Sequence, residues 1–351
     1  MPCLQHPVSS GCCRRILTDL HNGYLLLMAL ILSKENINGL VLSGNIDDYP
    51  EGIILPIDKP YRWTSADVIR KVKWCACRHF HKKNLKVGHA GTLDPLATGV
   101  LLVCIGKATK LAEDLQKHEK EYVAGITFGA TTPSYDLEKE IDARYPVDGV
   151  SEESLRRVLP GFLGEQEQVA PLFSAKSVDG VRAYELARKE WKRMQEQKAE
   201  QVEVEVNASA AEASASEGQA VGFDHSAVET LSKQLINIID IDLIRFCPDG
   251  IPADSLEQCD VGLHNPDGSV NLRNSRINVT DNSSLGLPHA DIRVACSKGT
   301  YVRALARDLG EALGSGAHLD GLRRTRTGGF RVEDALTVEQ AVSVLQSNAT
   351  E

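Results

Sequence analysis

The chain has 351 residues, of which 42% are hydrophobic and 25% charged, and its formal net charge is −9. This composition is typical of a globular protein with one large domain or two smaller ones. The negative total argues against a uniformly basic nucleic-acid-binding protein, although phosphate binding depends on a local basic face rather than on the total. The nine cysteines are an odd number without a Cys-x-x-Cys pair, so we expect no zinc site but reduced, mostly buried thiols of a cytosolic protein.

Residues 1–49 are expected to form an N-terminal extension that is partly disordered, with Met28 as an alternative start. Its apolar stretch, Tyr24–Leu32, is too short to span a bilayer and is not followed by a small-residue cleavage site. We therefore expect a cytoplasmic protein without a membrane segment.

Apolar runs at 39–44 and 52–58 are bounded by turn residues and predict short strands. A helix is predicted to begin directly after them, because Thr64 or Ser65 can cap its first turn. The helical spacing places three apolar side chains on one face that should lie in the core: Val68, Val72 and Cys75.

Positive charge is concentrated in and after this helix. Between Arg62 and His89 the only acidic residue is Asp67. The basic residues there are Arg62, Arg70, Lys71, Lys73, Arg78, Lys82, Lys83 and Lys86. Acidic and small residues prevail from Glu185 to Glu229. The net charge is therefore the sum of a basic segment and an acidic one, and it shows neither.

The remaining elements group strands with a few helices, without strict alternation, which favours an α+β fold. The predicted strands are 100–105, 122–128 (half-buried), 235–246 and 290–296, and the predicted helices are 107–117, 151–159, 184–197 and 300–313. Two segments near 195–230 and 248–288 are poor in apolar residues and are predicted to be flexible insertions.

A glycine-rich loop at 88–99 contains one acidic residue, Asp94, followed by Pro95. Glycines permit unusual backbone angles and the close approach of another chain. Proline biases the preceding residue to an extended conformation. On spacing alone, an ordinary Asp-Pro turn is the favoured interpretation.

The whole run Gly88–Gly99 resembles the catalytic motif of the TruB family of tRNA pseudouridine synthases. Further segments resemble that family in the same order: 54–60 with 63–65, 120–122, 173–176 with 180–188, 297–303, and 316–325. The resemblance covers roughly residues 50–340 apart from the insertions, and coincidence is a poor explanation for several motifs in one order.

The resemblance implies the pseudouridine synthase catalytic fold, a mixed, mostly antiparallel sheet with flanking helices, over residues 50–345. Since the chain ends soon after the last motif, no PUA domain is expected. This favours a bacterial-type enzyme that converts uridine 55 in the T-arm of tRNA over the guide-RNA branch of the family.

The resemblance also implies roles for individual residues. Asp94 would be the nucleophile, Arg303 would pair with it and keep it ionised, and Tyr122 would stack on the flipped uracil. The remaining expected substrate contacts are Lys59 (holding the loop or the RNA), His89 (filling the gap that the uridine leaves), and Tyr301 and Leu322 (lining the pocket). Each of these four also has an ordinary interpretation, as a solvated or core residue.

The basic run from Arg62 to Lys86 would then lie against the phosphates of a folded RNA arm. We expect a monomer that needs no cofactor and no metal. Two alternatives are an RNA-binding or RNA-folding module without activity, and an interaction protein with the acidic insertion as a partner-binding tail. Retention of Asp94, Tyr122 and Arg303 argues against the inactive module, because binding alone requires none of them.

Overall fold

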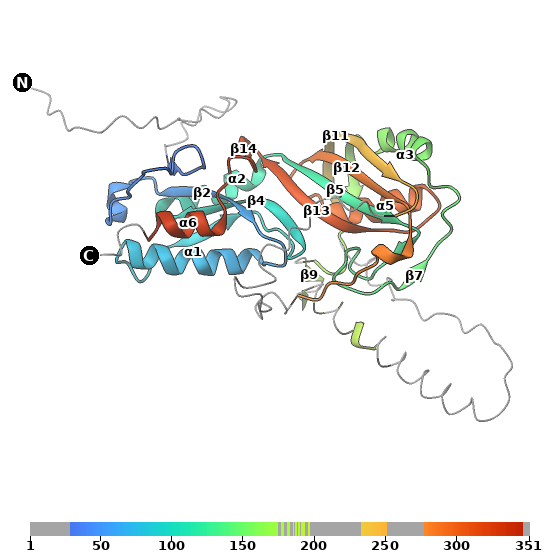
Figure 1. Ribbon diagram of the computed structural model, residues 1–351, viewed down its shortest axis with the longest axis horizontal. Coiled ribbons are helices and arrows are strands. Elements are labelled where there is room, and N and C mark those ends of the chain that lie inside the picture. Colours follow the sequence, from blue (N-terminus) through green and yellow to red (C-terminus); the bar gives the residue numbers. More distant parts are fainter. Residues whose placement is uncertain are drawn as a thin grey trace, which may run out of the picture. The chain divides into compact units, whose positions relative to one another are not determined.

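The computed structural model describes residues 29–174, 233–250 and 277–346, and only short stretches between 177 and 196. Residues 1–28 and most of both expected insertions therefore lie outside the described residues. The chain divides into two compact units, Met1–His118 with Arg324–Glu351, and Glu119–Arg323 (Figure 1). The single domain expected over residues 50–345 remains a prediction, and each unit is described by itself.

The first unit is built on a small sheet in which β2 and β4 pair antiparallel. A short edge strand, β1, runs parallel to β2, and β3 pairs antiparallel with β4. The bounds of these strands are Leu30–Ile31 (β1), Ile53–Lys59 (β2), Val87–Ala90 (β3) and Ala97–Ile105 (β4). The end of β13 (Ala317–Thr327) and β14 (Phe330–Arg331) complete the sheet of this unit.

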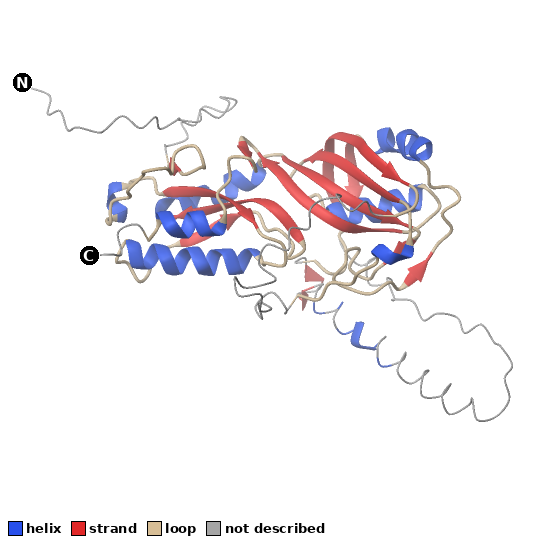
Figure 2. Ribbon diagram, viewed as in Figure 1, coloured by secondary structure: helices blue, strands red, loops and turns tan. Residues whose placement is uncertain are grey.

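Helix α1 (Ser65–His79) begins where the sequence predicts. The hydroxyl of Thr64 accepts a hydrogen bond from the backbone N–H of Asp67, and the Asp67 carboxylate accepts one from the N–H of Thr64, which is a capping box. The predicted apolar face is buried. It packs beside α6 (Val338–Val344), which contacts β2 (Figure 2).

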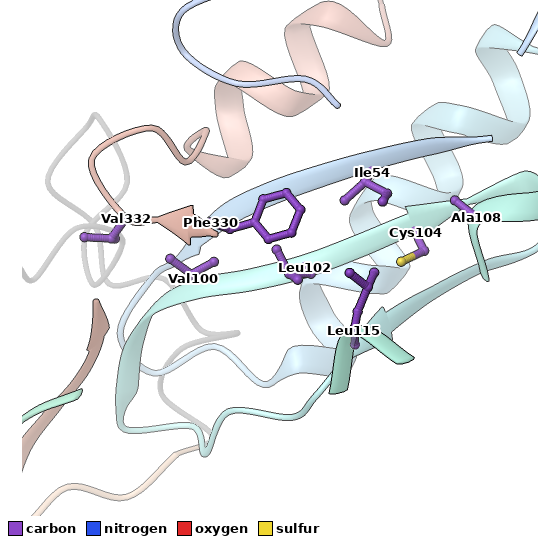
Figure 3. Packing of buried hydrophobic residues seen from close by; sticks show 9 residues of the cluster. Ile54, Val100, Leu102, Cys104, Ala108, Leu115, Phe330 and Val332 are labelled. Atoms are coloured by element: carbon purple, nitrogen blue, oxygen red, sulfur yellow. The ribbon is translucent and has the colours of Figure 1, made fainter. Parts of the chain in front are cut away.

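Strand β4 has both faces buried. Val100, Leu102 and Cys104 belong to an apolar cluster with Ile54 from β2 (Figure 3). Leu115 from α2 (Ala112–Lys117) and Phe330 from β14 join that cluster, and α2 follows the 3-10 helix η2 (Gly106–Leu111). Leu101, Val103 and Ile105, which alternate with the cluster residues, are also fully buried. The prediction of a buried strand at 100–105 is thus confirmed.

The prediction of a strand at 39–44 is wrong. This segment has no strand geometry, and the 3-10 helix η1 (Ile46–Asp48) follows it. The first two residues of β2 are instead paired with Leu30–Ile31. Leu42 is nevertheless buried, whereas Val41 is 67% exposed. The segment thus contributes an individual side chain to the core without forming a strand.

The second unit contains an antiparallel sheet with the order β5-β12-β11-β8 and the first part of β13 beside β5. Its strands are β5 (Lys120–Phe128), β8 (Gly164–Gln168), β11 (Gln234–Cys247) and β12 (His289–Cys296), with short pairs β6 (Ala130–Thr131) and β7 (Ala143–Arg144), and β9 (Ser177–Val178) and β10 (Val181–Arg182). Helix α5 (Val302–Ala312) contacts β5, and α3 (Glu152–Val158) contacts β11. The short helices are η3 (Leu159–Phe162) and η6 (Ser283–Leu285).

Strands that are mostly antiparallel, with helices packed against them, confirm the predicted α+β class.

The burial of β5 differs from the prediction. The strand β5 was expected to be half-buried, but Gly125 and Thr127 on its second face are buried as well. The carboxylate of Asp320 and the imidazole of His289 cover that face, and a methyl group at Gly125 would collide with the Asp320 carboxylate.

Candidate functional site

Asp94 lies in a six-residue connection between β3 and β4, and it is partly exposed. The predicted glycine-rich loop is thus shorter than expected, because residues 87–90 and 97–99 belong to strands. The backbone carbonyl of Asp94 accepts a hydrogen bond from the N–H of Ala97 at 3.1 Å, which closes a turn.

The residues on either side of Asp94 are fixed by side chains from α1 and β2. The hydroxyl of Ser65 accepts a hydrogen bond from the N–H of Leu93 at 3.0 Å and donates one to the Leu93 carbonyl at 3.1 Å. The ammonium of Lys59 donates to the carbonyl of Pro95 at 3.2 Å. Hydrogen bonds therefore hold the backbone on both sides of Asp94.

Lys59 is fully buried. Its ammonium also donates to the carbonyls of Pro60 (3.0 Å) and Trp63 (2.6 Å), so all three protons have acceptors. Burial lowers the pKa of Lys59 to about 7, although the nearby negative charge of Asp94 works in the opposite direction. Of the two expected roles, these contacts support holding the loop rather than the RNA.

Arg324 is a loop contact for which the sequence suggested no role. It is 1% exposed, and its Nε donates to the carbonyl of Val100 at 2.7 Å. Its two terminal nitrogens reach the carbonyls of Thr92 and Gly91, both at 3.4 Å. Gly99 must be glycine, because its φ is +101° and a methyl group would collide with the backbone of Arg324. In the sequence, the only signal for Arg324 was its position in the segment 316–325 that resembles the TruB family.

His89 lies on β3 rather than in the loop, with an intermediate exposure. Burial, and then the positive charge of Arg324, lower the pKa of its imidazole. Its Nδ1 is buried and has no hydrogen-bond partner within the part of the chain that the structure describes. The lowered pKa favours the neutral form of the imidazole at neutral pH.

In the second unit, Arg303 is the second residue of α5 and is 6% exposed. Its terminal nitrogens donate to the carbonyls of Ser134 and Phe173, both at 3.0 Å. Its Nε lies 3.7 Å from the carboxylate of Asp136. A buried cation at the positive end of a helix is electrostatically unfavourable, so these acceptors are needed to hold it there. The expected pairing with Asp94 remains a prediction.

The other residues expected at the site are also in the second unit, two on strands and one just before a helix. Tyr122, on β5, is 9% exposed. Tyr301 precedes α5, and its backbone N–H donates to the side chain of Gln168 at 2.9 Å. Leu322, on β13, is partly exposed. Tyr301 and Leu322 are both of intermediate exposure, and their expected contacts with a substrate remain a prediction.

Across the described ranges, no group of three or more His, Cys, Asp or Glu side chains is placed to hold a metal ion. None of the helices described here has the length and apolar character needed to cross a membrane. The described cysteines are free thiols: Cys75, Cys77, Cys104, Cys247 and Cys296.

Two family descriptions match the chain. "TruB family pseudouridylate synthase (N terminal domain)" matches residues 78–224, and "tRNA pseudouridylate synthase B C-terminal domain" matches residues 303–350. Among solved structures, the chain is similar to a chain of the archaeal box H/ACA sRNP Nop10-Cbf5 complex, with 21% identity and a TM-score of 0.45. That match covers 86% of this chain and 55% of the other, so the chain spans just over half of that relative.

Curated relatives match over nearly their whole length. The tRNA pseudouridine synthase B of Phocaeicola vulgatus is 44% identical, over 83% of this chain and 92% of the relative. The protein of the same name from Flavobacterium johnsoniae is 35% identical, over 83% of this chain and 95% of the relative. Identity at this level over this span shows the family, and the chain therefore belongs to the TruB family of pseudouridine synthases.

Proposed function

We propose that this enzyme isomerises uridine to pseudouridine at position 55, in the T-arm of tRNA, with Asp94 as the nucleophile. The observation that carries the proposal is the anchored loop. Leu93 and Pro95 are both held by hydrogen bonds from other elements, so the carboxylate between them is presented with little freedom. A plain Asp-Pro turn requires no such anchoring.

The proposed reaction needs no net gain or loss of atoms. The Asp94 carboxylate forms a bond to the ribose C1′ of the target uridine as the bond between C1′ and the uracil N1 breaks. The uracil rotates, a bond forms between C1′ and its C5, the carboxylate leaves, and the C5 proton is lost while N1 gains one. A carboxylate suits this sequence because it is ionised at neutral pH and is also able to leave.

The target uridine must leave its stack to reach a protein side chain, at a cost of a few kcal/mol. We propose that His89 fills the gap, and its depressed pKa supports this role because a neutral imidazole is less costly to place among stacked bases. In the second unit, we propose that Tyr122 stacks on the uracil, Arg303 keeps the nucleophile ionised, and Tyr301 and Leu322 contact the base.

The test is to incubate the purified protein with an unmodified tRNA transcript and to map pseudouridine at single-nucleotide resolution. We expect one product, at position 55, and none when the transcript carries cytidine there. A product at another position would overturn the T-arm assignment. Tight binding without any product would support the RNA-binding module instead.

A further inference from the structure

The solvent side of α1 carries exposed residues of the basic run from Arg62 to Lys86, together with one tryptophan that the expected phosphate contacts do not explain. They are Arg70, Lys71, Lys73, Trp74 and Arg78, called the α1 basic face below. At about 100° per residue these positions gather on one side of the helix. The opposite side is the buried apolar face.

Trp74 is the unusual member of the α1 basic face. Its side chain is 51% exposed, although tryptophan is highly buried on average. The guanidinium of Arg78 lies 4.7 Å from the centroid of its ring, close enough for a cation–π contact. Core packing explains neither side chain. An exposed aromatic ring among basic residues is the combination that stacks a nucleobase and neutralises phosphates.

The positive charge of this face is largely uncompensated. Asp67 pairs with Arg70 at 2.7 Å. Lys71, Lys73 and Arg78 have no ion-pair partner among the residues whose placement is described. An external anion such as a phosphate group therefore meets a face with net positive charge.

The same helix reaches the anchored loop, because Ser65 at its start binds Leu93. With a rise of 1.5 Å per residue, Trp74 and Arg78 lie roughly 14 and 20 Å along the helix axis from Ser65. An RNA contact on the α1 basic face would therefore hold a part of the RNA remote from the reacting uridine.

We propose that the α1 basic face is a second RNA-contact surface, on which phosphates pair with Lys71, Lys73 and Arg78 while one unpaired base stacks on Trp74. The identity of the RNA, a tRNA, rests on the proposed function. The contact itself requires no catalysis, so binding measurements test it separately.

The experiment measures the Kd of an unmodified tRNA transcript at several salt concentrations. We expect Trp74→Ala to weaken binding roughly fivefold or more, with an unchanged salt dependence, and Trp74→Phe to restore most of the affinity. We expect Lys73→Ala to reduce the slope of log K against log salt by about 0.7 to 0.9. Arg157→Ala, which removes an exposed arginine from α3 in the other unit, is the matched control and should leave the Kd unchanged.

Tryptophan emission gives a second readout, since the chain has three tryptophans and Trp74 is one of them. Stacking should quench part of the emission when tRNA is added, and Trp74→Phe should remove that part. Wild-type affinity and salt slope in Trp74→Ala and Lys73→Ala would overturn the proposal. If these binding effects appear but no pseudouridine forms, the RNA surface stands and the proposed chemistry fails.

Discussion

Asp94 owes its position to residues that act on its neighbours. Ser65 holds the backbone of Leu93, Lys59 holds that of Pro95, and Arg324 reaches the carbonyls that precede them. A misplacement of about 1 Å is enough to cost an enzyme about a hundredfold in rate. Substituting a residue that contacts the loop, but not the substrate, should therefore still lower the turnover rate.

Arg324 gives the clearest test of this. We predict that Arg324→Lys lowers kcat roughly tenfold or more with a smaller change in KM, because a compact ammonium cannot span carbonyls that Arg324 reaches with three separate nitrogens of its planar guanidinium. Steady-state kinetics on a tRNA transcript measure this, with a thermal melt to confirm folding. Arg326→Lys, two residues further on the same strand, is the control and should retain kcat. An unchanged kcat in Arg324→Lys would remove its positioning role.

The family resemblance in the sequence allowed Asp94 and Lys59 to be identified, but not the loop contacts of Ser65 and Arg324. For Lys59 the sequence left two roles open, holding the loop or the RNA, and Arg324 was only one residue of the family-like run 316–325. Both are buried and each contacts three backbone carbonyls, and the carbonyl of Pro95 lies 36 positions from its donor Lys59. A single sequence carries no signal for such contacts between distant backbone and side chain.

At the scale of elements, the sheet of the second unit contains a buried charged network. The Nδ1 of His289 lies 2.7 Å from Asp320, and its Nε2 lies 3.1 Å from Asp291. Carboxylates only accept hydrogen bonds, so both ring nitrogens carry protons and the imidazole is positively charged. Arg245 also pairs with Asp291, and the hydroxyl of Thr127 donates to Asp320. The charges of the network sum to zero.

This network predicts a pH-dependent stability. Burial by itself would lower the pKa of His289, but the hydrogen bonds and charges of the two carboxylates outweigh it and raise the pKa to about 9. Because the pKa is near 6.5 in the unfolded chain, the stabilisation is fully present below pH 6.5 and is lost as the pH rises through 9. Its upper limit is about 3 kcal/mol.

We expect the free energy of unfolding of the wild type to fall between pH 6.5 and 9.5 relative to that of His289→Gln, by up to about 3 kcal/mol. Denaturant unfolding at several pH values measures the difference. The comparison cancels other groups that titrate in this range, among them Lys59, whose depressed pKa has the opposite effect on stability. Parallel pH profiles for the two proteins would show that His289 is not a buried cation.

Elements whose signals are local could be predicted well. The cap at Thr64, the helix predicted from residue 151 and the apolar run of β4 all appear where the sequence placed them. Strand β3 was missed because Gly88 and its neighbours favoured a loop, and its pairing with β4 compensates for that preference. The network around His289 was missed because its members come from four strands that only the fold brings together.

At the scale of the whole molecule, the proposed catalytic and loop-positioning residues are divided between the two compact units. Asp94, Lys59, His89 and Arg324 belong to the first, and Tyr122 and Arg303 belong to the second. The family assignment covers both units, since its two matching descriptions lie at residues 78–224 and 303–350. The sequence motifs that identify the family are therefore spread over both units, and no single motif would have been sufficient.

The central claim, that Asp94 carries the chemistry, is tested most directly by mapping pseudouridine in a tRNA transcript treated with Asp94→Asn. Asparagine has nearly the same shape but is no longer a carboxylate nucleophile. Asp58→Asn is the matched control, because Asp58 also lies close enough to Lys59 to influence its pKa but is outside the loop. We predict no pseudouridine at position 55 with Asp94→Asn and normal formation with Asp58→Asn. Pseudouridine formed by the Asp94→Asn protein at the wild-type rate would contradict the account.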